Sequence, residues 1–404
     1  MSLANKLEAD AIGGSAGRSS GHRLPPVRAR DGTSMRALFV IASLERGGSE
    51  GQLTALLSRI HPERVAATLA TVVAARDRLS TEVLRACNVP HVVLAPGRAS
   101  GVRRWGIAAM RLERLLRRLR PDVVYAWGEY PTLIAVPLAR LRGIPAMVAR
   151  RNSGNVSIPA TVGRVARWVE SKAGLVTVNS GAAFTEAVRH GVAREHLRLV
   201  PNGHEVGPQS SEPRGREVRL GYVAGLRPGK GHRQLLQALS EVRAKAPWCV
   251  ELAGNGPLVG ELRAEVEKRG LSERVRFLGI VDDIPSFWRE HHACLLLSQF
   301  EGSSNALIEA GLAGRPLLAN DDPGNRELVS PGTGILVGAD DPPATARKIE
   351  EIIDDPLLRQ RLGRGASEAM RRFEMEDMVT AHVDALAECR GRATCVVGAV
   401  PERV

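Results

Sequence analysis

The sequence is poor in aromatic residues and has no apolar run long enough to cross a membrane. Phe, Trp and Tyr make up 3% of the 404 residues, so Leu, Val, Ile and Ala must fill any hydrophobic core. A transmembrane helix needs about 20 consecutive apolar residues, and the N-terminus lacks the apolar segment of a signal peptide. We therefore expect a cytoplasmic protein whose only contact with a membrane is peripheral.

Patterns typical of metal binding are missing as well. The five cysteines are scattered, without a CxxC pair or another spacing typical of metal ligands. Such cysteines are compatible with a reducing cytoplasm. No Asp-x-Asp motif occurs, so the sequence offers no candidate ligands for a metal ion that bridges a diphosphate. We expect neither a metal nor another cofactor.

The chain is long enough for two domains, and it carries a net charge of +12. Residues 1–34 are rich in Gly, Ser, Ala and Arg and show no periodic pattern, so we expect a disordered leader there or a true start at Met35. Most of the excess basic residues follow in the first half of the chain.

A basic amphipathic helix is predicted at Gly101 to Arg120, with apolar residues on one side and arginines on the other. One interpretation is a surface helix that packs on its own sheet. The other is a helix whose arginines face anionic lipid headgroups. The two interpretations are compatible, because arginines on a packed helix still project outward.

Short apolar runs alternate with segments of helix length, which predicts parallel sheets covered by helices. The expected strands of the first domain are 37–41, 67–73, 92–94, 123–126, 146–149, 175–179 and 197–200. Those of the second domain are 218–223, 248–253, 275–278, 293–297, 316–319 and 334–337. We place a first domain at 35–206, a linker at 207–217, a second domain at 218–372, a terminal helix at 373–390 and a loose tail at 391–404.

The stretch from Phe300 to Ala310 follows one of these strands and opens a helix. A loop at a helix N-terminus favours a phosphate, because backbone N–H groups and the helix dipole point at it. Glu301 precedes the helix and Glu309 lies about two turns into it, so the pair can contact a sugar and a ribose. A bare pair of glutamates is more often a solvated helix face. The loop residues are Gly302, Ser303, Ser304 and Asn305.

The run from Ser298 to Val337 resembles the donor-binding signature of glycosyltransferase family 4. Members of this family are retaining enzymes that use nucleotide-sugars. The family's two signature glutamates fall on Glu301 and Glu309. The resemblance extends from about residue 35 to about residue 386, and it implies that the terminal helix at 373–390 packs back toward the first domain. It implies the α/β fold called GT-B, in which two Rossmann-like domains face a central cleft, with the donor on the second domain and the acceptor on the first.

The run AGLRPGKGHRQLL resembles the family's loop that brings an Arg and a Lys to the donor diphosphate. Lys230 falls on the family's Lys. Gly225 stands where an Arg is usual, and Arg227 follows two residues later. Two cations in a Gly-rich turn before a helix suit a diphosphate, because the charge of the leaving group must be balanced. We expect Glu301, Lys230 and Arg227 to be the catalytic residues.

On the acceptor side, Gly47 and Gly48 fall on a Gly-Gly turn that faces the cleft in the family, although they also suit a tight structural turn. Trp127 stands where many members have a His. It is either a stacking platform for a sugar or a core residue. Arg150 and Arg151 end a predicted strand, where open sheets place ligands. Together the Trp and the RNS sequence resemble a subset of the family that assembles bacterial surface polysaccharides.

The resemblance implies a metal-independent hexosyltransferase that retains the anomeric configuration. We expect its acceptor to be a hydroxyl of a saccharide or of a polyprenyl-diphosphate-linked saccharide, with peripheral membrane contact through the helix at 101–120. A nucleotide-sugar epimerase of the same fold is an alternative, disfavoured by the glutamate pattern. A basic, non-catalytic membrane- or nucleic-acid-binding protein is another. No known nucleic-acid motif occurs, so we expect no nucleic acid partner.

Overall fold

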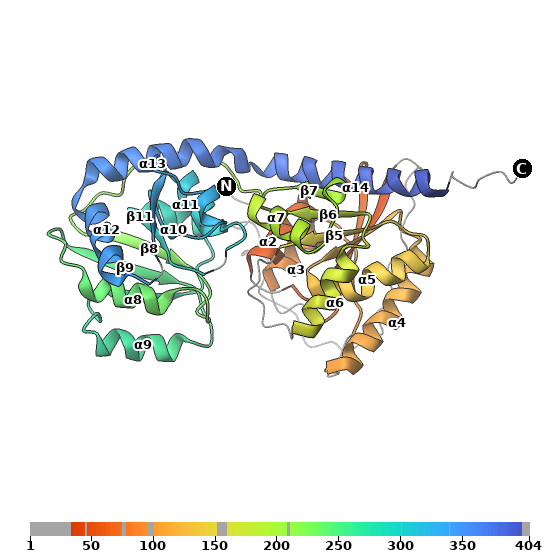
Figure 1. The fold of residues 1–404 in the computed structure, drawn as a ribbon, viewed down its shortest axis with the longest axis horizontal. Coiled ribbons are helices and arrows are strands. Elements are labelled where there is room, and N and C mark those ends of the chain that lie inside the picture. The colour runs from red at the N-terminus through yellow and green to blue at the C-terminus, as the bar shows by residue number, and fades with distance from the viewer. Residues whose placement is uncertain are drawn as a thin grey trace, which may run out of the picture. The chain divides into compact units, whose positions relative to one another are not determined.

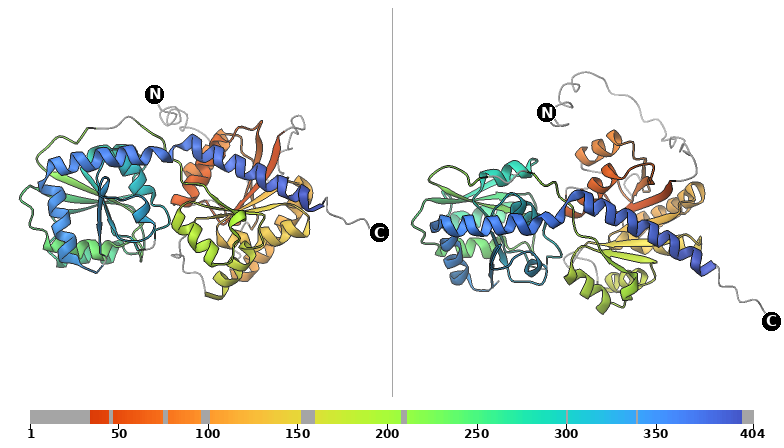
Figure 2. Two further views of the ribbon diagram at one scale, coloured as in Figure 1. Left: turned by 45° about the horizontal axis from the view of Figure 1, so that its top comes forward. Right: turned by 90° about the horizontal axis from the view of Figure 1, so that it is seen from above.

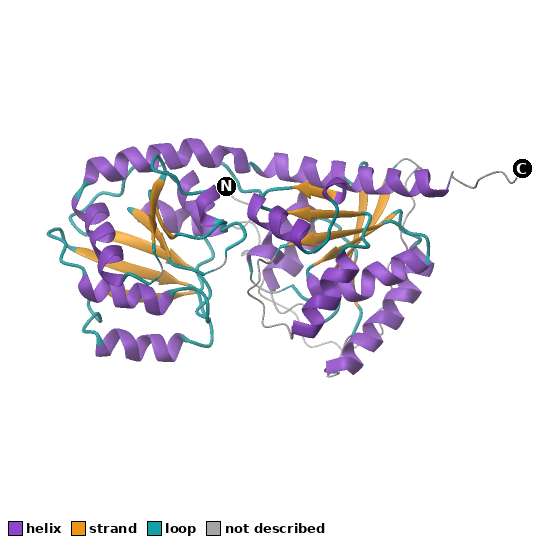
Figure 3. Ribbon diagram, viewed as in Figure 1, coloured by secondary structure: helices purple, strands orange, loops and turns teal. Residues whose placement is uncertain are grey.

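The computed structural model describes residues 34–44, 47–74, 78–95, 101–151, 160–207, 211–299, 301–338 and 340–397. Within these residues the chain forms two parallel sheets, each covered by helices (Figures 1 and 3). The first sheet is built from the N-terminal half of the chain and the second from the C-terminal half.

The first sheet has seven strands in the order β3-β2-β1-β4-β5-β6-β7. The strands are β1 (Met35–Ile41), β2 (Val65–Thr71), β3 (His91–Val93), β4 (Val123–Trp127), β5 (Ala146–Arg150), β6 (Leu175–Val178) and β7 (Leu197–Leu199). The helices are α2 (Gly48–Arg59), α3 (Arg78–Ala86), α4 (Gly101–Leu119), α5 (Glu129–Leu141), α6 (Ala160–Glu170), α7 (Gly181–Arg189) and the 3-10 turn η1 (Arg194–His196).

The second sheet has six strands in the order β10-β9-β8-β11-β12-β13. They are β8 (Val218–Val223), β9 (Trp248–Ala253), β10 (Val275–Gly279), β11 (Ala293–Leu296), β12 (Leu317–Asn320) and β13 (Gly334–Val337). The helices are α8 (His232–Glu241), α9 (Val259–Lys268), α10 (Ile284–Glu290), α11 (Asn305–Leu312), α12 (Pro342–Asp354), α13 (Pro356–Met370) and α14 (Met375–Val397), with 3-10 turns η2 (Asn325–Glu327) and η3 (Arg371–Phe373).

Every strand expected from the sequence is present, with ends displaced by no more than two residues. The reason is that strands of a parallel sheet with both faces covered are continuous apolar runs. Strand β11, for example, is buried along its whole length. The α/β class and the two Rossmann-like sheets are therefore confirmed.

Both sheets reverse their strand order at one point. Strand β1 lies between β2 and β4, and β8 lies between β9 and β11. In open parallel sheets, ligands bind at the carboxyl ends of the two strands that flank such a point. The loops expected to bind a ligand are therefore those that follow β1, β4, β8 and β11.

The last helix, α14, packs in the hydrophobic core of the first sheet, although α8 to α13 directly before it belong to the second half. Apolar side chains of α14, including Met378, Val383 and Leu386, lie in one buried cluster with residues of β1, β4 and α2. Figure 2 shows α14 lying across the strands of the first sheet. The loose tail expected from residue 391 is wrong for 391–397, because α14 continues to Val397.

Helix α4 has the two sides expected from its sequence. Its apolar side, with Ala108, Leu112, Leu115 and Leu116, is buried. Several arginines on the other side are exposed, and they are Arg103, Arg111, Arg114, Arg117 and Arg118. Among the described helices, none has both the length and the apolar composition needed to cross a membrane.

Candidate active site

Two of the residues expected to be catalytic meet in an ion pair. Lys230 follows β8 and Glu301 follows β11, the strands that flank the reversal of the second sheet. The Nζ atom of Lys230 lies 2.6 Å from Oε1 of Glu301, and the two side chains are 18% and 14% exposed. An amine and a carboxylate are thus brought together at the edge of the sheet where a ligand is expected.

Tyr222 of β8 holds both loops in place. Its hydroxyl donates to the carbonyl of Lys230 at 2.6 Å and accepts from the backbone N–H of Leu297 at 3.0 Å. Burial raises the pKa of Tyr222, so this hydroxyl keeps its proton. The loops also need Gly231, which has φ +66° and leaves no room for a Cβ beside the carbonyl oxygen of Leu297.

Arg227 lies in the same turn and is exposed. The backbone N–H of Lys230 donates to the carbonyl of Arg227 at 3.3 Å. Its Nε atom lies 3.6 Å from the point where a Cβ of Gly225 would stand. The Arg227 side chain therefore occupies the space over Gly225, where the family usually carries an Arg.

The loop before α11 is tightly built. Ser304 caps the helix, and its hydroxyl oxygen accepts from the N–H of Leu307 at 3.4 Å. The backbone of Glu301 and Gly302 packs directly on Gly324. A Cβ on Gly324 would stand 2.0 Å from the backbone carbonyl oxygen of Glu301. Of the loop residues, Gly302 and Ser304 are buried, whereas Ser303 and Asn305 are half-buried.

Glu309 lies against His204, which follows the turn at Asn202 and Gly203. Oε1 of Glu309 is 3.5 Å from Nδ1 of His204. Burial raises the pKa of Glu309 to about 8 and lowers that of His204 to about 4. Both shifts favour the uncharged forms, a protonated carboxyl and a neutral imidazole. His204 was not identified from the sequence.

Asn202 contacts residues from both halves of the chain. Its Nδ2 donates to Oδ1 of Asn305 at 2.7 Å, and its Oδ1 accepts from Nη1 of Arg151 at 3.0 Å. Asn305 also donates to the carbonyl of Gly48 at 3.4 Å. The expected Gly-Gly turn and donor loop are therefore brought together here. Gly48 and its exposed neighbour Gly47 open α2.

Trp127 and Arg151 are core residues, which corrects the stacking role considered for Trp127. Trp127 is 1% exposed, and its indole N–H donates to Oγ of Ser49 at 2.9 Å. The Arg151 guanidinium lies 4.5 Å from the Trp127 ring centroid, and its Nη2 is 2.7 Å from Nε2 of His382. At 9% exposure, Arg151 acts by positioning Asn202 and α14.

A small cavity lies at the carboxyl ends of β4 and β5. It measures about 60 Å³ and is lined by Glu129, Arg150 and Glu170, among others. Arg150 pairs with Glu170 at 2.9 Å, and one carboxylate oxygen of Glu170 is buried without a hydrogen-bond partner among the described residues. Burial raises the pKa of Glu129 and Glu170. Glu129 could have been identified from the sequence, because it is an acidic residue that closely follows a predicted strand.

The described residues contain no group of three or more His, Cys, Asp or Glu side chains placed to hold a metal ion. The charged groups of the second-sheet site are the amine of Lys230, the carboxylate of Glu301 and the guanidinium of Arg227. Such a site can bind a phosphate ester and balance negative charge on a leaving group.

Two family models match the chain. Residues 46–206 match the Glycosyltransferase Family 4 model, and residues 206–369 match the model of the glycosyl transferases group 1. The matches meet between β7 and β8, where the chain passes from one sheet to the other.

The chain is also similar to known proteins over most of its length. The 2-deoxystreptamine glucosyltransferase of Streptomyces kanamyceticus is 30% identical over 297 residues, 64% of this chain and 76% of that protein. Glycogen synthase of Mycobacterium tuberculosis is 28% identical over 324 residues, 73% of this chain and 78% of that protein. The structure of Anabaena HepE in complex with UDP-glucose has a TM-score of 0.77 at 22% identity, covering 87% of this chain and 99% of that one. This likeness confirms the GT-B fold.

Proposed function

Because the chain belongs to the glycosyltransferases of family 4 and group 1, we propose that it transfers a hexose from a nucleotide-sugar to a hydroxyl of a saccharide or lipid-linked saccharide. The observation that carries the proposal is the Lys230–Glu301 pair at the reversal of the second sheet. The relatives' names, a glucosyltransferase and a glycogen synthase, support a hexose and a carbohydrate acceptor. We place the reaction in bacterial surface polysaccharide synthesis, as the sequence resemblance implies.

In the proposed complex, Lys230 and Arg227 contact the donor diphosphate. The amine of Lys230 is held by Glu301, and the backbone carbonyl of Lys230 accepts from the Tyr222 hydroxyl, so the side chain is positioned before the donor arrives. Arg227 lies over Gly225 and replaces the missing arginine of the family. Fixed cations stabilise the charge that develops on the diphosphate as the bond to the sugar breaks.

The two glutamates have separate roles in this proposal. Glu301 accepts hydrogen bonds from hydroxyls of the donor sugar and orients its anomeric carbon. Glu309 binds the ribose hydroxyls, and its proton allows it to donate as well as accept. The loop at Gly302, Ser303, Ser304 and Asn305 places backbone N–H groups near the phosphates.

The transfer retains the anomeric configuration. The bond between the anomeric carbon and the diphosphate oxygen breaks, and the acceptor oxygen bonds to the same face of the sugar. The departing diphosphate takes the acceptor proton, so no protein base is required. Lys230 and Arg227 supply the positive charge that a bound metal provides in other enzymes, and we propose that none is needed.

We place the acceptor on the first sheet, beside Gly48 and the cavity at β4 and β5. Glu129, Glu170 and Arg150 offer hydrogen-bond acceptors and donors for hydroxyl groups. The exposed arginines of α4 support peripheral contact with an anionic membrane, where a lipid-linked acceptor would be found.

The function is tested with UDP-, GDP- and ADP-sugars and a saccharide acceptor, with and without EDTA. We expect one nucleotide to raise the melting temperature in a concentration-dependent way, and product analysis to show a new glycoside with release of the nucleotide. EDTA should change neither result. An epimerised nucleotide-sugar without any glycoside would favour the epimerase alternative.

Variants of the two glutamates sharpen the same test. Glu309→Ala should raise the donor concentration required, and Glu301→Ala should chiefly slow transfer. Glu368→Ala, an exposed glutamate of α13, is the matched control. Full turnover of both site variants at limiting donor would contradict the assigned roles.

A further inference from the structure

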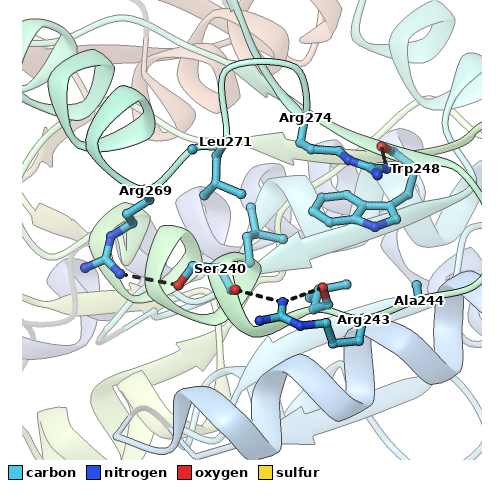
Figure 4. A pocket seen from close by; sticks show the side chains of 10 residues that line it. Ser240, Arg243, Ala244, Trp248, Arg269, Leu271 and Arg274 are labelled. Atoms are coloured by element: carbon cyan, nitrogen blue, oxygen red, sulfur yellow. Dashed lines mark hydrogen bonds between the residues drawn. The ribbon is translucent and has the colours of Figure 1, made fainter.

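We propose that a second pocket, built entirely from the C-terminal half of the chain, binds a small soluble organic phosphate (Figure 4). The pocket has a volume of about 430 Å³. Sites for small-molecule ligands measure roughly 300–1,000 Å³. It is therefore large enough for a phosphate group and the molecule that carries it.

This pocket is separate from the candidate active site. It includes Trp248, the first residue of β9, and Ser240 near the end of α8. Ala253, at the other end of β9, precedes the loop in which Asn255 contacts Leu226, one residue before Arg227. A six-residue strand spans about 17 Å, so the pocket lies at the opposite edge of the sheet.

Three arginines surround the pocket. Nη1 of Arg243 donates to the carbonyls of Ser240 and Val242, each at 3.0 Å. Nη1 of Arg274 donates to the carbonyl of Trp248 at 3.0 Å, and its guanidinium lies 4.9 Å from the indole centroid. Figure 4 shows Arg243 and Arg269 on two sides of Ser240, and Arg274 beside Trp248. Carbonyl contacts hold a guanidinium in place without cancelling its charge.

The charges of the pocket are not balanced by its own residues. Within the described parts of the chain, Glu265 is the one carboxylate that pairs with any of these three guanidinium groups, at 2.6 Å from Arg269. Glu350 and Asp354 lie beside the pocket, but they accept from the backbone N–H groups of Arg243, Lys245 and Ala246 and not from these guanidinium groups. The pocket therefore keeps the charge of two arginines available for an anionic ligand.

Arg243 and Arg274 have N–H groups beyond those that contact backbone carbonyls. A guanidinium has five N–H donors, and the carbonyl contacts of Arg243 and Arg274 use only their Nη1 atoms. Their Nε and Nη2 groups have no hydrogen-bond partner among the described residues, so they can bind the oxygens of a phosphate through paired hydrogen bonds. Buried Leu239 and Leu271 form an apolar floor that can pack against the rest of the ligand.

The binding test uses glucose 6-phosphate, inorganic phosphate and glucose as probes in titration calorimetry on the full chain. We expect glucose 6-phosphate to bind more tightly than phosphate, and glucose not to bind. Arg274→Ala and Arg243→Gln should each weaken binding about tenfold. Glu265→Gln should tighten it about threefold, because it removes the competing carboxylate. Arg347→Ala, an exposed arginine of α12, should change nothing.

A cross-comparison separates this pocket from the donor site. Lys230→Ala should leave the affinity for glucose 6-phosphate unchanged, whereas Arg274→Ala should leave nucleotide affinity unchanged. Loss of glucose 6-phosphate binding in Lys230→Ala but not in Arg274→Ala or Arg243→Gln would overturn the proposal. So would binding only to phosphatidic acid vesicles, which would point to a lipid. If no nucleotide binds but Arg274→Ala still weakens the binding of glucose 6-phosphate, the proposed function is refuted and the proposal for this pocket stands.

Discussion

Both sheets present the carboxyl ends of parallel strands to a ligand, but different side chains stand there. Beyond β8 and β11 stand Lys230 and Glu301, which are partly exposed and paired with each other. At the ends of β4 and β5 stand Trp127 and Arg151, which are buried and hold Ser49, Asn202 and His382. The side chains at these strand ends therefore form a partly exposed ion pair in the second half and are buried among their neighbours in the first.

This difference shows that strand order predicts where a site lies but not what its residues do. In the first half, the polar groups available to a ligand come from neighbouring elements, at Glu129 in α5 and at Glu170 in α6. The contrast between the exposed ion pair of the second half and the buried side chains of the first can be tested by removing one cation from each.

The largest effect is expected for Lys230→Ala. Loss of a fixed group that stabilises transition-state charge slows catalysis by roughly 100- to 1,000-fold, and steady-state kinetics would measure the fall in kcat. Lys268→Ala, an exposed lysine of α9, is the control. Transfer at the wild-type rate would remove the chemical distinction between the two halves.

Arg151→Met should chiefly lower stability. The substitution leaves buried acceptors on Asn202 and His382 with one partner fewer, at a cost of about 2 kcal/mol. Denaturant unfolding of Arg151→Met and of the exposed control Arg189→Met would measure the difference. If Arg151→Met unfolded like the wild type but lost acceptor binding, Arg151 would be a ligand-binding residue instead of a packing residue.

Glu309→Gln should remove a pH dependence from stability. A carboxyl whose pKa is raised from 4.5 to about 8 keeps its proton in the folded protein, so stability falls as pH rises through this range. The slope attributable to Glu309 is at most about 1.4 kcal/mol per pH unit. His204, with a pKa lowered to about 4, contributes the opposite slope, and only below its unfolded value of 6.5.

Unfolding measured from pH 6.5 to 8.5 therefore isolates Glu309 from His204. We expect Glu309→Gln to gain stability relative to the wild type as pH rises, and the Glu368→Gln control to follow the wild type. Parallel curves for all three proteins would mean that the carboxyl of Glu309 is already ionised at pH 6.5.

The last prediction concerns α4. Replacing Arg111, Arg114 and Arg118 by Ala should weaken binding to anionic vesicles by about 1 kcal/mol for each arginine. The control replaces exposed Arg347, Arg361 and Arg364 of the second half. Equal vesicle binding by the two triple variants would make α4 an ordinary surface helix.

The strands and the Lys230–Glu301 site were predictable from the sequence because their signals are local. Each strand is a short apolar run, and each of these two residues follows one. The residues expected to contact a donor were named from a resemblance, and their roles stay predictions. Their mutual contact at 2.6 Å is what the structure adds.

The environment of a side chain was not predictable in the same way. Whether Trp127 is covered depends on Arg151 and on His382, which is far away in the sequence. The cavity beside Glu129 and the pocket around Arg243, Arg269 and Arg274 are each assembled from several elements. The end of α14 was misplaced because residues 391–397 contain a Gly and no clear helical periodicity.

The path of α14 has a consequence for building hybrid enzymes. Its apolar residues complete the core of the first sheet, although they are encoded after the whole of the second. In a hybrid joined once, at the linker, the second sheet and α14 would come from one parent and the first sheet from the other. Helix α14 would then no longer match the core of the first sheet. Two junctions, one near 207–217 and one near Glu374, keep each core with its own side chains.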